Sequence, residues 1–76
     1  MRVTVLLSDQ PGKLHELTGA IQSIGGNIVA LGTFLGESPQ NRTVTFKVSY
    51  VELEQLKRVI TPFVDRILDI RETKAT

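Results

Sequence analysis

The spacing of apolar residues changes along this chain in a way that few folds accommodate. Val3, Val5 and Leu7 alternate with polar residues, and this period of two is that of a β-strand. Between Leu14 and Ile24 the apolar residues recur every three or four positions, which is the period of a helix with one buried face. We therefore predict a strand at the N-terminal end that is followed directly by a helix.

The same two periods return in the rest of the chain. Residues 27–35, NIVALGTFL, are apolar on both faces and rich in β-formers, and residues 43–50 alternate strictly. Turn-forming residues between these two runs predict a hairpin. A second helical stripe runs from Leu53 to Phe63, after Ser49-Tyr50-Val51-Glu52, which fits a capping box. Residues 64–72 complete the pattern as a strand.

The predicted order of elements is β-α-β-β-α-β. With right-handed crossovers this order gives a ferredoxin-like α+β sandwich, in which a four-stranded antiparallel sheet carries two helices on one face. We expect residues 1–72 to form this single domain and residues 73–76 to be a flexible tail. A single core of this size provides only marginal stability, and the chain has no cysteine for cross-links. We therefore expect self-association to add stability.

Composition narrows the range of functions. A formal net charge of +1 provides no broad basic surface, and we predict binding to neither nucleic acid nor membranes. With no cysteine and one histidine, we expect no metal site, and we expect no cofactor. No stretch approaches the roughly 20 apolar residues of a membrane span. Residues 1–3 show no signal-peptide layout, and we predict a cytoplasmic location.

The turn from Ser8 to Gly12 joins the first predicted strand to the first predicted helix, and two interpretations of it are possible. In one reading it is only a connection, in which Asp9 caps the helix and Pro11 starts it. In the other, the N–H groups of the helix start hold a carboxylate or phosphate, and Gly12 lets the ligand approach the backbone. Asn27 is likewise either a turn residue or an amide that pairs with both charged groups of an amino acid.

These features occur together, in the order and at the spacing of a known family. The segment LLSDQPGKLHELTGAIQSIGGNIVALGTF, residues 6–34, resembles an ACT domain, a regulatory module that binds small molecules, often amino acids. The match rests on the D-x-P-G-x-L turn, the L-x-x-L-x-x-x-I helix and the G-G-N-I start of the next strand. It is most similar to the ACT domain that follows paired CBS domains in acetoin-utilisation-type proteins.

The resemblance implies a ligand site that two subunits share. In amino-acid-binding ACT domains, the turn before the first helix of one subunit meets the start of the second strand of the other. The matching positions of this chain are Asp9, Gln10, Gly12, Leu14, Asn27 and Ile28. Some members have a histidine and an asparagine where this chain has Leu7 and Asp9, and that departure argues against a serine-type site.

The second predicted strand provides the expected dimer surface. It lies at a sheet edge in this fold, where an exposed apolar strand needs a cover, and isologous pairing with a second copy would provide one. Glycine within the strand would permit close backbone approach. The expected interface residues are Gly19, Val29, Leu31, Gly32 and Thr33. We expect one face of this strand to carry Ile28, Ala30 and Phe34, and the other to carry Val29, Leu31 and Leu35.

The leading hypothesis is a regulatory module that binds an amino acid at a homodimer interface. An effector domain or CBS domains would be further partners if the chain is part of a longer protein. The alternative is a ligand-free dimerisation domain of the same fold. We predict no enzyme, because an acylphosphatase-like site would need a first-turn arginine and a catalytic set. An RNA-recognition module would need aromatic residues on the exposed sheet face, where we predict Thr43, Thr45, Lys47 and Ser49.

Overall fold

A computed structural model describes residues 1–72 of the chain, and the predicted tail, residues 73–76, lies outside the described residues. The elements in chain order are β1 (Arg2–Ser8), α1 (Lys13–Ser23), β2 (Asn27–Leu35), β3 (Asn41–Ser49), α2 (Leu53–Ile60), the 3-10 turn η1 (Thr61–Phe63) and β4 (Arg66–Arg71). The predicted α+β architecture is confirmed. Within the described part of the chain, no helix combines the length and the apolar character that crossing a bilayer requires.

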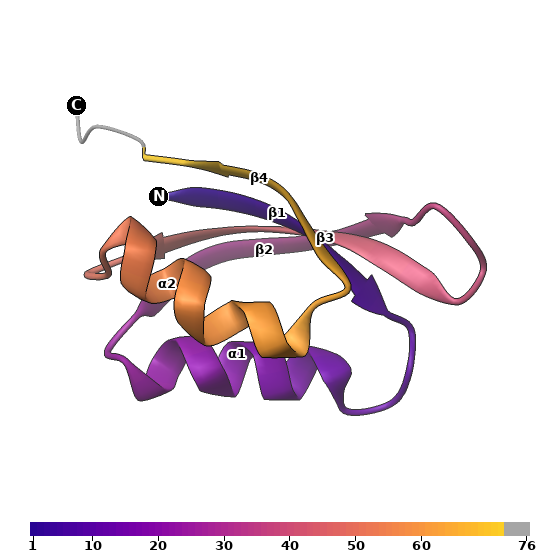
Figure 1. Ribbon diagram of the computed structural model, residues 1–76, viewed down its shortest axis with the longest axis horizontal. Helices are drawn as coiled ribbons and strands as arrows, with labels where there is room; N and C mark the ends of the chain where they lie inside the picture. The colour runs from indigo at the N-terminus through magenta and orange to yellow at the C-terminus, as the bar shows by residue number, and fades with distance from the viewer. Residues whose placement is uncertain (73–76) are drawn as a thin grey trace.

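The strands form one antiparallel sheet in the order β2-β3-β1-β4, so β2 and β4 are its edges. Both helices lie against the same face of the sheet, and the opposite face carries no helix (Figure 1). We call this opposite face the open face. The core lies between the sheet and the helices, and its buried residues are Val3, Val5, Leu7, Leu17, Ile21, Val44, Phe46, Val48, Leu56 and Ile60. Each of them belongs to an apolar stripe that the sequence predicts.

The glycine pair Gly25-Gly26 ends α1. Gly25 has a φ of 81°, a left-handed conformation that glycine adopts without strain. Its N–H donates to the carbonyl of Gln22 at 3.0 Å, and the N–H of Gly26 donates to the carbonyl of Ile21 at 3.1 Å. These two bonds form a Schellman motif, which satisfies the last carbonyls of the helix and turns the chain into β2.

The helix starts differ from the predictions. Asp9 does not cap α1, because its carboxylate accepts a hydrogen bond from Arg42, and the N-cap is Gly12. The predicted capping box at Ser49 is also wrong. Ser49 stays paired in β3, Tyr50 turns the chain with a φ of 67°, and α2 begins only at Leu53. Ser49 therefore belongs to the sheet and does not cap α2.

A β-bulge changes which face the second half of β2 presents. The pairing of β2 with β3 shifts between Ile28 and Ala30, so Val29 is an extra residue. Before the bulge, Ile28 lies opposite the core residue Val48. After it, Leu31 lies opposite Phe46, which leaves the alternate residues of β2 on the open face. The predicted face shared by Ile28, Ala30 and Phe34 is therefore wrong: Ala30, Gly32 and Phe34 lie on the open face.

Two glycine-to-alanine variants should have opposite effects on stability. A Cβ at Gly26 would lie 2.7 Å from Ile21 Cγ2 and 2.9 Å from the Ile21 carbonyl oxygen. We expect Gly26→Ala to lower the free energy of unfolding by about 1–3 kcal/mol. Around Gly19, in α1, no atom outside the helix's own backbone lies within 4 Å of such a Cβ. Gly19→Ala should therefore raise the free energy of unfolding by about 1 kcal/mol.

Urea unfolding followed by circular dichroism, at several protein concentrations, measures both changes. Loss of stability in Gly19→Ala at every concentration would contradict the helix-propensity argument. Wild-type stability of Gly26→Ala would contradict the steric one.

Candidate ligand site at the first turn

The turn between β1 and α1 is held against the β2–β3 hairpin. The backbone N–H of Asp9 donates to the carbonyl of Gln40 at 2.8 Å. The Asp9 carboxylate accepts a hydrogen bond from Arg42 Nε, with 2.7 Å between Nε and Oδ1. Arg42 lies opposite Leu7 in the β1–β3 register, which is why it reaches the end of β1. The two segments that meet here are therefore fixed by strand pairing.

Two surface hollows meet at the Asp9–Arg42 pair. The smaller hollow, of about 220 Å³, lies between the turn and β2, and its walls include Gln10, Leu14 and Thr33. The larger and more open hollow, of about 1050 Å³, extends along the hairpin as far as Pro39. Asp9, Thr33 and Arg42 line both hollows. The ion pair consequently forms the boundary between two concave surfaces that a small ligand could occupy.

The Asp9–Arg42 ion pair is accessible to solvent. The Arg42 side chain is 54% exposed and the Asp9 side chain is 42% exposed. Such an exposed pair contributes only about 0–1 kcal/mol to stability, so a ligand that offers each partner a better contact can open it. A guanidinium favours a carboxylate in bidentate geometry, and a carboxylate favours an ammonium. The arrangement suits a ligand that carries both charges on neighbouring atoms.

The structure brings together part of the predicted ligand site. Asp9, Gln10 and Leu14 line the smaller hollow, and Gly12 is the N-cap residue beside them. Asn27 and Ile28 lie beyond the other end of α1, whose 11 residues correspond to about 16 Å. A single chain therefore does not join the two predicted halves of the site.

The predicted dimer residues on β2 lie on an exposed edge strand. Val29 is 62% exposed and Leu31 is 39% exposed, although both are apolar. Thr33 lines the hollows beside the turn, and Gly32 belongs to the open face. Gly19 is exposed on α1. The edge of β2 thus presents apolar side chains next to the candidate ligand site.

Sequence reasoning missed Arg42. The alternating run of β3 was expected to begin at Thr43, which left Arg42 in the hairpin loop, whereas β3 begins at Asn41. The position of Arg42 could have been inferred from the register of the two central strands, β1 and β3. Extending the pairing of the buried stripes by two residues beyond Val5 and Val44 places Arg42 opposite Leu7 and hence beside Asp9.

Comparisons with known proteins add information about the fold. No protein family model matches this chain, and no curated protein matches it in sequence. Among solved structures, one described as "GqqA- a novel type of quorum quenching acylases" superposes with a TM-score of 0.68. The superposition covers 88% of this chain at 22% sequence identity, and this chain spans 39% of the length of that one. A similarity at this level of identity shows a shared fold, and it shows no shared activity.

Proposed function

We propose that this chain is an ACT-like regulatory module that binds an α-amino acid at the interface of a homodimer. The observation that carries the proposal is the solvent-accessible Asp9–Arg42 pair, which divides two hollows at the turn where ACT domains bind ligands. The strand order β2-β3-β1-β4, with both helices on one face, supports the ferredoxin-like arrangement of that family.

The two charges of an α-amino acid are complementary to those of this pair. Its ammonium would replace Arg42 as the partner of Asp9, and its carboxylate would accept a bidentate pair from the Arg42 guanidinium. One weak ion pair within the protein would then be exchanged for two ion pairs with the ligand. The ligand side chain would extend into the smaller hollow beside Leu14 and Thr33.

Pairing of β2 with its copy would complete the site. In an antiparallel β2–β2 pair, the first residues of one strand lie beside the last residues of the other. Asn27 of the partner subunit would then approach the end of β2 that carries Thr33, which borders the Asp9–Arg42 pair. The Asn27 amide could donate to the ligand carboxylate and accept from its ammonium. In this geometry the two halves of the site, which the 11-residue helix separates within one chain, come from different subunits.

A ligand held by both subunits provides a mechanism for regulation. Residues of the two copies contact the ligand together in only one arrangement of the dimer, so the ligand stabilises that arrangement. The equilibrium shifts by the difference in ligand affinity between the two arrangements, and attached domains would follow. The exposed apolar residues Val29 and Leu31 favour a dimer even without a ligand. A ligand-free dimerisation domain is therefore the second candidate.

Calorimetric titration with the common amino acids tests the proposal. We expect saturable binding of at least one of them, and a loss of affinity of about tenfold or more in Asp9→Asn and in Arg42→Gln. Arg58→Gln, which removes an exposed arginine from α2, is the matched control and should bind as the wild type does. Asn27→Ala should also weaken binding.

Two ligand analogues assign each charge to its partner. The amide of the amino acid lacks the carboxylate, so Arg42→Gln should not weaken its binding further. The N-acetyl derivative lacks the ammonium, so Asp9→Asn should not weaken its binding further. If folded wild-type protein produces no heat with any amino acid, the amino-acid proposal is wrong, and a dimer in sedimentation experiments would then support the dimerisation domain. If binding is unchanged in Arg42→Gln, the site lies elsewhere.

A further inference from the structure

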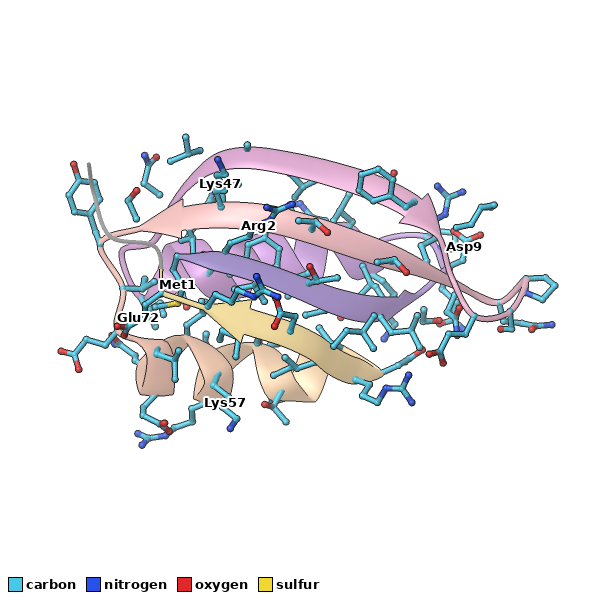
Figure 2. All side chains as sticks on the ribbon, turned by 90° about the horizontal axis from the view of Figure 1, so that it is seen from above. Met1, Arg2, Asp9, Lys47, Lys57 and Glu72 are labelled. Carbon is cyan, nitrogen blue, oxygen red and sulfur yellow. The ribbon has the colours of Figure 1, made fainter. Side chains whose placement is uncertain are left out.

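The open face of the sheet carries a row of three cationic residues on adjacent strands. Arg2 of β1 lies directly opposite Lys47 of β3 on one side and opposite Arg71 of β4 on the other. Arg2 alternates with the core residue Val3, and Lys47 with Phe46, so both side chains leave the sheet on the face away from the helices. Figure 2 looks onto this face and shows Arg2 and Lys47 beside each other.

Two of these three cations have no counter-charge among residues 1–72. Arg71 Nε lies 2.8 Å from the Asp69 carboxylate, whereas neither Arg2 nor Lys47 forms an ion pair with a described residue. Like charges that face each other across neighbouring strands destabilise a sheet. The free protein therefore carries an unfavourable pair that a bound anion would neutralise.

A hollow adjoins the two cations on the open face. Its volume is about 340 Å³, and its walls include Arg2, Lys47, Thr45 and Phe34. Gly32 also lines it, and the absence of a side chain there lets the Phe34 ring lie close to the strand, because a Cβ would be 3.3 Å from the ring. Phe34 is 60% exposed, so much of its ring surface is available to a ligand. An aromatic surface and two cations thus border one hollow of the size that small molecules occupy.

We propose that the open face binds a small anion joined to a flat ring, with the anionic group between Arg2 and Lys47 and the ring against Phe34. The anionic group is a phosphate or a carboxylate, since both pair with guanidinium and ammonium groups. This site lies on the opposite face of the sheet from the core, and it involves neither Asp9 nor Arg42. The proposal is therefore independent of the amino-acid site.

Nuclear magnetic resonance titration of the ¹⁵N-labelled chain tests this proposal. The probes are adenosine monophosphate for the phosphate arm, with inorganic phosphate and adenosine as its half-ligands, and indole-3-acetate for the carboxylate arm, with acetate and indole as its half-ligands. We expect saturable shifts in the amides of residues 30–34 and 45–47. At least one complete probe should bind about tenfold more tightly than either half-ligand, and its affinity should fall as salt is added.

Variants assign the two halves of the site. Arg2→Gln and Lys47→Gln should each weaken binding about tenfold, whereas Phe34→Ala should weaken the complete probe and leave inorganic phosphate unaffected. Lys57→Gln, on the helix side of the molecule (Figure 2), is the matched control and should have no effect. Lys47→Glu should abolish binding and raise the urea midpoint, because it turns the repulsive pair with Arg2 into an attractive one.

Three outcomes would overturn the proposal. The first is the absence of saturable shifts with both complete probes. The second is binding that Lys47→Gln leaves unchanged. The third is a set of shifts confined to the turn around Asp9, which would assign the anion to the amino-acid site and leave the open face without a ligand.

Discussion

Replacement of Phe46 by alanine is expected to lower the free energy of unfolding by about 3–5 kcal/mol. The Phe46 side chain is 1% exposed and is among the largest of the fully buried side chains. It belongs to β3, an inner strand of the sheet, and faces the two helices, so its removal leaves a cavity where the layers meet. At roughly 0.05–0.15 kcal/mol per residue, a chain of 76 residues has about 4–11 kcal/mol in total. The variant should therefore lose a large share of the total stability, and its urea midpoint, measured by circular dichroism, should fall accordingly.

Phe34→Ala is the matched control for this prediction. It removes the same side chain from the open face, where Phe34 is 60% exposed, and should change the free energy of unfolding by about 1 kcal/mol or less. Equal losses in the two variants would contradict the packing that the structure assigns to β3. A small loss in Phe46→Ala would contradict it as well.

Replacement of Val29 by lysine is expected to raise the dissociation constant of the proposed homodimer about a hundredfold. Val29 is 62% exposed at the bulge of edge strand β2, where pairing with a second copy would bury it. A lysine there would lose its water on association, and natural sheets use edge lysines to prevent such pairing. A hundredfold change corresponds to about 2.7 kcal/mol. Sedimentation velocity over a range of concentrations measures the change.

Leu68→Lys on the opposite edge strand, β4, separates this effect from that of an added charge. Leu68, like Val29, is an exposed aliphatic residue at a sheet edge, with 39% of its surface accessible, and the variant should dimerise as the wild type does. Dissociation by Leu68→Lys alone would place the interface on β4. A monomeric wild-type protein at all concentrations would remove the shared ligand site together with the dimer.

Much of the fold can be predicted from short stretches of this sequence. The alternation of Val44, Phe46 and Val48 predicts both a strand and its buried face, because every second side chain of a strand points the same way. The pair Gly25-Gly26 predicts the end of α1, because glycine adopts the left-handed conformation of the C-terminal cap. Both features depend on neighbours in the sequence, and both agree with the structure.

The candidate site is less accessible to such reasoning. Asp9, Gln10 and Leu14 could be placed together because they belong to one turn and the helix that follows it. The partner of Asp9 could not, because Arg42 is 33 positions away and meets it only through the β1–β3 register. The pattern of apolar residues does not indicate which charged residues pair, and an exposed ion pair adds little to stability.

The order of strands and helices along the chain, the core residues and the end of α1 follow from the local period of apolar residues and from glycine chemistry. The partner of Asp9, the start of α2 and the face on which Phe34 lies follow from strand pairing between distant segments. A single extra residue, Val29, moves Phe34 to the open face. The period of apolar residues does not reveal such a bulge. The bulge depends on how β2 pairs with β3 and packs on the core, and both involve residues distant in the sequence.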